Sequence, residues 1–215
     1  DGGNGLVAPM LALTLAATVT STLRLAALVM NFDFRHPAVA ASEWAALDVL
    51  SAGRAEPGFG AGWAEDEYRA AGIRFDPPAT RVRRFAEYVQ ALKGMWSSEP
   101  FSFAGECYQF ENFSSRPRPV QQPSLPLLIG VAQPQMIRVA ARHADIVSFG
   151  IFGGAAEADA KLEVLRSAAG ERLGAIEIRN GAQITITEDD PREVARRMLA
   201  RRPAGPSSNL APESI

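Results

Sequence analysis

The sequence is poor in residues that form covalent or metal cross-links. It contains one cysteine, Cys107, and two histidines, His36 and His143, in 215 residues. A single cysteine excludes an internal disulfide framework, so a reducing cytoplasm is the expected location. No group of His, Cys, Asp and Glu has the spacing of a metal site, and neither a P-loop nor a serine nucleophile elbow is present. We therefore expect no metal site, no P-loop nucleotide binding and no catalysis by a serine nucleophile.

The chain also lacks an excess of charge of either sign. Lys and Arg number 22 against 24 Asp and Glu, which gives a formal net charge of −2. The arginines are scattered rather than gathered in a stripe, so nucleic acid is not an expected partner. Residues 5–30 carry a single charge, Arg24, but Pro9 and the polar cluster 18–22 divide the run. We interpret it as a buried helix followed by a buried strand, not as a membrane span.

The composition that remains is typical of one soluble globular domain, which we assign to residues 1–215. Apolar residues make up 47% and charged residues 21% of the chain, both ordinary values. Helical and extended segments alternate along it. We expect helices at 6–21, 37–50, 65–71, 80–96, 134–143, 155–169 and 188–199, and strands at 23–31, 55–60, 127–130, 145–150 and 176–187.

One segment breaks this alternation. Aromatic residues flank Gly105 at both sides in 101–110, which predicts a β-hairpin, and a proline-rich connector follows it. We therefore assign 97–125 to an inserted hairpin and connector. The tail from residue 203 is rich in proline and serine and is expected to be a loop.

The alternation predicts an α/β fold, because apolar strands connected through helices form parallel sheets covered on both faces. A doubly wound sheet and a barrel share this pattern, and periodicity alone does not separate them. The segment Gly58-x-Gly60-x-Gly62 follows a strand, but it is not the glycine pattern of dinucleotide-binding folds.

Several short segments, in the same order, resemble the luciferase-like monooxygenase superfamily, and its coenzyme F420-dependent branch most closely. The resemblance covers about residues 1–190 and rests on NFDFRHPA (31–38), LDVLSAGR (47–54), GFGAGW (58–63), EY (67–68), RPRPVQ (116–121), PLLIG (126–130) and AARHAD (140–145). It implies a TIM (β/α)8 barrel with an inserted segment. By this alignment the chain begins after the second strand and stops before the eighth, so we expect about 30–60 further residues at each end.

The resemblance also implies a flavin or deazaflavin site at the carboxyl ends of the strands, where TIM barrels bind their ligands. By position, the peptide bond before Val29 corresponds to a cis bond that the family places against the cofactor ring. The residues expected to bind cofactor are Val29, Met30, Asn31, Gly60, Ala61, Gly62, Gly130, Val131, Ala132, Gln133 and Ser148.

Each part of this site has a plainer alternative. Val29 and Met30 could be barrel core, and Gly60 to Gly62 could form a tight turn between strand and helix. The start of helix 134–143 could bind phosphate through free backbone N–H groups, although Gly130 stands alone where the family often has a glycine run. Trp63 occupies a position where the family's sugar-phosphate dehydrogenases carry an acidic proton donor, and tryptophan cannot take that role. We name no catalytic residue.

The remaining conspicuous residues are expected to be structural. His36 precedes a helix, and His143 lies at a helix C-terminus, where a partial positive charge is favourable. Cys107 is expected to be an idle thiol. The arginines of helix 80–96 are expected to form a solvated face: Arg81, Arg83 and Arg84.

The function implied by the resemblance is hydride transfer between reduced coenzyme F420 and a small organic substrate, in which the cofactor supplies the chemistry. An FMN-dependent monooxygenase is the close alternative. A degenerate barrel that binds flavin or nothing, without activity, is the alternative from another class. Membranes are not expected partners, and a homodimer is left open.

Overall fold

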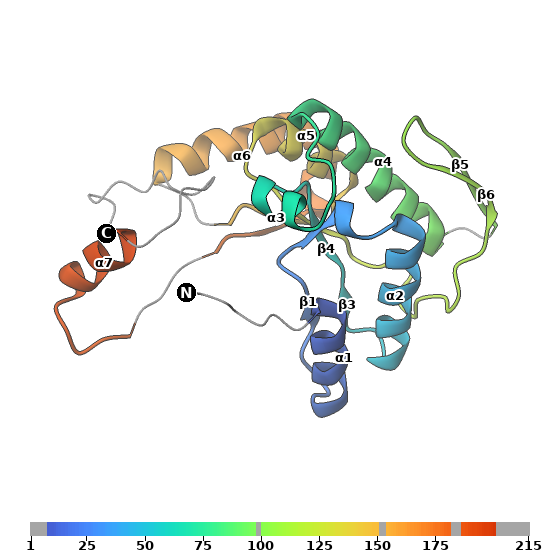
Figure 1. Cartoon of the computed structure of the whole chain (residues 1–215), viewed down its shortest axis with the longest axis horizontal. Helices are drawn as coiled ribbons and strands as arrows, with labels where there is room; N and C mark the ends of the chain where they lie inside the picture. The colour runs from blue at the N-terminus through green and yellow to red at the C-terminus, as the bar shows by residue number, and fades with distance from the viewer. Residues whose placement is uncertain (1–7, 98–99, 151–153, 182–185, 201–215) are drawn as a thin grey trace.

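The computed structural model describes residues 8–97, 100–150, 154–181 and 186–200, and its centre is a parallel sheet (Figure 1). The strands are β1 (Leu25–Ala26), β2 (Met30–Asn31), β3 (Ala55–Glu56), β4 (Gly58–Gly60), β7 (Leu128–Gly130), β8 (Ile146–Ser148) and β9 (Glu177–Arg179). The main sheet has the order β2–β4–β7–β8–β9, and β1 pairs in parallel with β3. Strand order follows chain order without reversal. That is the arrangement of a barrel wall, whereas a doubly wound sheet reverses.

Most of the helices lie together on one side of the sheet, whereas the helix Pro191–Ala200 lies apart from them (Figure 1). The helices are α1 (Pro9–Val19), α2 (Pro37–Leu50), α3 (Glu65–Ala70), α4 (Pro78–Ser97), α5 (Pro134–His143), α6 (Ala155–Ala169) and α7 (Pro191–Ala200), with 3-10 turns η1 (Phe32–Phe34) and η2 (Gly170–Ala175). Proline begins α1, α2 and α5, where its missing N–H costs nothing. Within the described residues, no helix is long and apolar enough to cross a membrane.

Two predicted strands are interrupted. The strand expected at 23–31 is divided into β1 and β2, and the peptide bond Leu28–Val29 between them is cis, as the resemblance implied. The strand expected at 55–60 is divided at Pro57, which has no N–H to donate to a ladder. Of the last expected strand only Glu177–Arg179 is extended, and 182–185 lie outside the described residues, as does the tail from 203.

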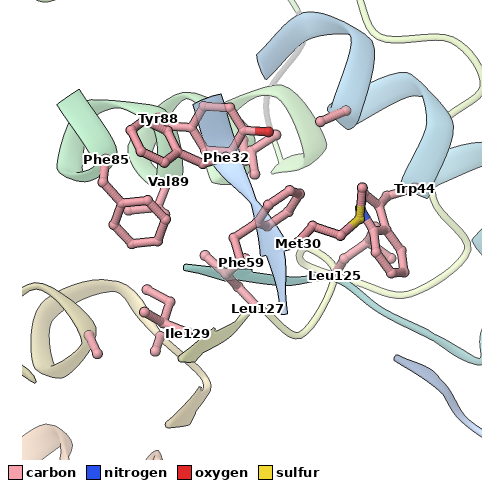
Figure 2. Packing of buried hydrophobic residues seen from close by; sticks show 14 of the residues in the cluster. Met30, Phe32, Trp44, Phe59, Phe85, Tyr88, Val89, Leu125, Leu127 and Ile129 are labelled. Atoms are coloured by element: carbon pink, nitrogen blue, oxygen red, sulfur yellow. The ribbon is translucent and has the colours of Figure 1, made fainter. Parts of the chain in front are cut away.

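The face of the sheet that meets the helices is apolar (Figure 2). The register places Met30 beside Phe59 and Phe59 beside Ile129, so these three side chains point the same way. The Phe59 ring lies 5.2 Å from that of Tyr88 on α4 and 6.4 Å from that of Trp44 on α2. Burying each large apolar side chain contributes about 1.5–3 kcal/mol. The alternate residues therefore point to the concave side of the sheet.

The hairpin predicted at 101–110 forms from β5 (Phe101–Ala104) and β6 (Gln109–Phe113). It lies outside α2 and α4 (Figure 1). The Glu87 carboxylate of α4 accepts three backbone N–H groups of the hairpin turn at 2.8–3.1 Å, from Glu106, Cys107 and Tyr108. The Tyr108 ring also contacts His36, just past the end of β2, so the turn lies near the carboxyl ends of the strands. The assignment of 97–125 as an insertion in one domain stays a prediction.

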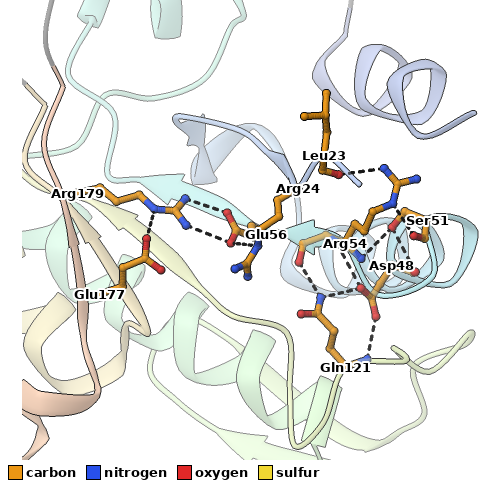
Figure 3. Close-up of polar contacts among 10 residues, drawn as sticks. Leu23, Arg24, Asp48, Ser51, Arg54, Glu56, Gln121, Glu177 and Arg179 are labelled. Atoms are coloured by element: carbon orange, nitrogen blue, oxygen red, sulfur yellow. Dashed lines mark hydrogen bonds and ion pairs between the residues drawn. The ribbon is translucent and has the colours of Figure 1, made fainter. Parts of the chain in front are cut away.

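A buried carboxylate joins two of the sequence segments on which the resemblance rests. Asp48, in the last turn of α2, accepts the backbone N–H groups of Val120 and Gln121 at 2.8 and 3.0 Å, and the Gln121 side-chain amide at 2.7 Å (Figure 3). The proline-rich connector is thereby held against α2.

Charged residues bridge the amino end of the concave face (Figure 3). The Glu56 carboxylate of β3 pairs with Arg24 before β1 and accepts two hydrogen bonds from Arg179 of β9, at 2.8 and 3.1 Å. Glu177 also pairs with Arg179. Glu56 lies just before β4, and β9 is three strands away from β4 in the main sheet. The bridge therefore crosses the concave side of a curved wall. The barrel does not close within the described residues, whose main sheet has five strands.

Replacing Glu56 with Gln is expected to lower the free energy of unfolding by about 1.5–3 kcal/mol, because two arginines lose a charged partner. The Glu56 side chain is 2% exposed, so water cannot replace it well. Urea unfolding checks the value. The matched control is Glu177→Gln, which removes another partner of Arg179 that is 51% exposed and should change stability by less than about 1 kcal/mol. Equal effects of the two variants would contradict a special role for the bridge.

His143 is not the favourable positive charge expected at the end of α5. Burial lowers its pKa below the ordinary value of 6.5, and the nearby cations Lys93, Arg172 and Arg142 lower it further. Arg172 already donates to the carbonyl oxygens of Ala141 and Ala144 at this helix end. The neutral imidazole is therefore the stable form.

This depressed pKa predicts an acid-sensitive contribution to stability. The unfolded state binds the His143 proton first, so the contribution is fully present above the ordinary pKa of 6.5 and is lost as the pH falls through the folded pKa. Urea unfolding between about pH 8 and pH 5 should show a larger loss for the native protein than for His143→Gln. Parallel pH profiles for the two proteins would rule the contribution out.

Candidate functional site

Val29 forms a ledge at the carboxyl end of the sheet. Its side chain lies over two neighbouring strands: a Cβ added to Gly60 would lie 2.8 Å from Val29 Cγ2, and one added to Gly130 would lie 3.0 Å from Val29 Cγ1. Both glycines therefore make room for Val29. The valine remains 39% exposed, so it presents an apolar surface above these strand ends.

Met30 and Ser148 lie on opposite faces of the sheet. Met30 is buried and packs with Phe59 on the side of the helices, so the structure does not bring it to the ledge. Ser148 is also buried, but its register partner is Gly130, which places it on the same face as Val29.

The glycine turn after β4 is shaped by neighbouring side chains. Gly62 has a φ of +68°, which favours glycine, and a Cβ there would lie 2.2 Å from the hydroxyl of Tyr68 and 2.9 Å from Nδ2 of Asn31. The carbonyl oxygens of Ala61 and Gly62 accept hydrogen bonds from Arg81. The turn is thus fixed by the protein's own contacts, which agrees with the plainer alternative for this segment.

The start of α5 offers fewer donors than the sequence suggested. The Val131 N–H donates to the Ser148 carbonyl at 2.8 Å, and Pro134 has no N–H. Gln133 is the N-cap residue and makes no side-chain capping bond. Of the segment 131–133, Ala132 and Gln133 contribute the backbone N–H groups nearest the helix end.

Arg81 and Arg84 do not form the solvated face that was expected. Arg84 is 19% exposed and binds both carboxylate oxygens of Asp33, at 2.8 and 2.9 Å, and Asp76 at 2.8 Å. The hydrogen bonds with Asp33 are the largest cause that raises the pKa of Arg84 above its usual value. The hydrogen bond from Arg84 in turn lowers the pKa of Asp76. Arg81 is buried with its guanidinium 3.9 Å from the centre of the Phe75 ring. Only Arg83 fits the expectation.

Tyr68 connects this ion pair to the strand end. Its hydroxyl lies 2.9 Å from Asp33 Oδ2 and 3.0 Å from Asn31 Oδ1. Burial, as the largest cause, raises the pKa of Tyr68 to about 12, so the hydroxyl keeps its proton. Sequence reasoning missed Asp33, Tyr68 and Arg84 as site residues. For the arginines the signal was helical spacing: Arg81 and Arg84 lie four residues before the buried Phe85 and Tyr88, respectively.

Within the described ranges, the structure gives no catalytic contact to His36, Cys107 or Trp63. His36 Nδ1 accepts the Ala38 N–H and caps α2, as expected of a structural histidine. Cys107 is an exposed free thiol. Trp63 follows Gly62 and is 60% exposed, with no acid–base capacity. Among the residues that the structure describes, no group of His, Cys, Asp and Glu could hold a metal.

The family model described as luciferase-like monooxygenase matches residues 1–209. The chain belongs to this family. FMNH2-dependent dimethylsulfone monooxygenase of Pseudomonas putida is 32% identical over 167 residues, which cover 76% of this chain and 44% of that protein. F420-dependent glucose-6-phosphate dehydrogenase of Kineococcus radiotolerans is 35% identical over 130 residues, which cover 60% of this chain and 38% of that protein. This luciferase-like chain spans less than half the length of these relatives.

Solved structures agree with the family fold. Coenzyme F420-dependent tetrahydromethanopterin reductase from Methanopyrus kandleri superposes with a TM-score of 0.77 at 24% identity, over 90% of this chain and 59% of that one. A monooxygenase from Streptomyces bottropensis gives a TM-score of 0.71 at 26% identity, over 89% and 58%. The luciferase-like barrel fold expected from the sequence is confirmed, and the family includes both FMN-dependent and F420-dependent enzymes.

Replacing Arg84 with Gln is expected to destabilise the protein by about 3–5 kcal/mol, because the buried Asp33 carboxylate loses both charged hydrogen bonds. The adjacent Arg83 is the matched control. It is 59% exposed and pairs with the exposed Glu106, so Arg83→Gln should cost less than about 1 kcal/mol. Chemical unfolding of the two variants measures the difference. A loss at Arg84 no larger than the loss at Arg83 would show that the pair adds nothing to stability.

Proposed function

We propose that this chain forms the cofactor-binding part of an oxidoreductase that transfers a hydride between reduced coenzyme F420 and a small organic substrate. The observation that carries the proposal is the Val29 ledge. It is an apolar surface at the carboxyl ends of parallel strands, supported from below by Gly60 and Gly130. In TIM barrels ligands bind at this end.

The residues around the ledge suit a flat ring that carries a phosphate. Val29 would support one face of the ring, and Asn31 lies two residues later, at the end of β2. The backbone N–H groups of Ala132 and Gln133, at the positive end of the α5 dipole, would meet the phosphate, with Ser148 nearby. When bound, the cofactor supplies the hydride chemistry, and the protein supplies position and exclusion of water. Met30 has no part in this arrangement.

FMN is the second candidate, and a specific comparison favours it. The FMNH2-dependent relative matches 76% of this chain, against 60% for the F420-dependent dehydrogenase. Both cofactors carry a tricyclic ring that would fit the ledge. We favour F420 because the ordered motifs of the chain resemble that branch of the family more closely. Trp63 in place of an acidic residue argues against sugar phosphates as substrates.

The test is titration of the protein with coenzyme F420 and with FMN while tryptophan fluorescence is followed. Trp63 is 60% exposed beside the site, whereas Trp44 and Trp96 are fully buried, so Trp63 is expected to report binding. F420 should bind more tightly than FMN. Gly60→Leu should abolish binding, because its side chain would displace Val29. It should leave the far-ultraviolet circular dichroism unchanged, since this end of a barrel serves ligands more than stability.

Two controls make the titration decisive. Trp63→Phe should still bind the cofactor, which the absorption of the cofactor itself would show. The tryptophan fluorescence of this variant should change little on binding. Tight binding of FMN with none of F420 would reverse the cofactor assignment. Failure to bind either would favour a degenerate barrel without activity.

A further inference from the structure

A groove lies between α5 and α6, which pack side by side on the helical side of the sheet (Figure 1). It has a volume of about 530 Å³ and is lined by Arg138 and Arg142 of α5 and by Glu163, Val164, Ser167 and Ala168 of α6. Sites for small molecules occupy roughly 300–1,000 Å³. The groove is therefore large enough to hold an organic molecule, on the face of the sheet opposite to the Val29 ledge.

The wall that α5 contributes carries two positive charges. Arg138 and Arg142 are four residues apart, so helical spacing places them next to each other on one face of α5. Both are exposed, and within the described part of the chain neither has an ion-pair or hydrogen-bond partner. The planar guanidinium group matches the paired oxygens of a phosphate or a carboxylate. Two such groups on one wall can bind a single oxyanion together.

The wall that α6 contributes does not neutralise these charges. Glu163 is 72% exposed and lies 3.7 Å from Arg166 of its own helix, so it already has a cationic partner. Val164 and Ala168 are partly buried and pack against the hydrophobic core, which gives the groove an apolar floor. A positive wall beside an apolar floor suits an anion that has an apolar part, rather than a bare inorganic ion.

The end of α5 also has a positive potential that is felt inside the protein. Burial is the largest cause of the lowered pKa of His143, and the charges of Lys93, Arg172 and Arg142 lower it further. Lys93 is paired with Asp145, and Arg172 donates to carbonyl oxygens at the end of α5. Of these three cations, Arg142 is the one that lacks such a partner among the described residues. Its charge is available to a ligand in the groove.

We propose that the groove between α5 and α6 binds a small organic anion, with the phosphate or carboxylate group on Arg138 and Arg142 and the apolar part on Val164 and Ala168. The site is separate from the Val29 ledge, so it does not rest on the proposed function. Glu163 carries the same sign of charge as the ligand and therefore weakens its binding.

Calorimetric titration of the protein with phenyl phosphate tests the proposal. Inorganic phosphate, which lacks the apolar part, should bind about 10-fold more weakly. Phenol, which lacks the charge, should not bind measurably. Phenylacetate separates the two sources of the oxyanion, because tighter binding of phenylacetate than of phenyl phosphate would identify a carboxylate ligand, and the reverse order would identify a phosphate.

Single variants assign the binding to the groove. Arg138→Gln and Arg142→Gln should each weaken the binding of phenyl phosphate by about 10-fold, because a charged hydrogen-bond donor is lost. Glu163→Gln should strengthen it about 2- to 5-fold, because a like charge is removed. Arg83→Gln is the matched control. It removes the same charge from an exposed position on α4 and should change the affinity less than about twofold.

Three results would overturn the proposal. Unchanged affinity in both Arg138→Gln and Arg142→Gln would place phenyl phosphate elsewhere, such as the start of α5. An equal loss in Arg83→Gln would show attraction by the overall charge of the protein. Absence of binding by both phenyl phosphate and phenylacetate would show that the groove holds only solvent. None of these results bears on binding of F420 or FMN at the ledge.

Discussion

The ion pair between Asp33 and Arg84 connects three parts of the structure that are far apart in the sequence. Asp33 follows β2, Arg84 lies on α4, and Tyr68 joins the pair from α3. A buried carboxylate without such partners would cost several kcal/mol. Because both oxygens of Asp33 are used, the end of the first strand cannot move independently of the two helices. Through Tyr68, the pair also contacts Asn31 and the glycine turn at Gly62.

Much of the fold follows from local pattern. The alternation of apolar strands and helices, the prolines that begin α2 and α5, and the hairpin are properties of short segments, and each is present as expected. The arginines of α4 show where simple reading of charge fails. Arg81 and Arg84 share a face with Phe85 and Tyr88, and helical spacing outweighs the usual preference of arginine for water. The interruptions at Leu28–Val29 and Pro57 shorten strands whose composition alone suggests longer ones.

The region of the site could be predicted from the sequence, but its internal contacts could not. Motif resemblance indicated the strand ends around Val29, Gly60 and Gly130. Which group fills the space beside each glycine is decided by residues about 30 to 100 positions away, and one sequence carries no record of such pairings. The cofactor is harder still to predict, because a ledge that supports one flat tricyclic ring supports another.

The bridge between Glu56 and Arg179 joins residues 123 positions apart. Contacts of such long range form slowly, because the intervening chain must first be ordered. During synthesis, at about 5–20 residues per second, Arg179 emerges on the order of ten seconds after Glu56. Through that interval Arg24 is the cation that pairs with the glutamate. Docking of β9 therefore adds two charged hydrogen bonds, late in folding, to a carboxylate that already pairs with Arg24.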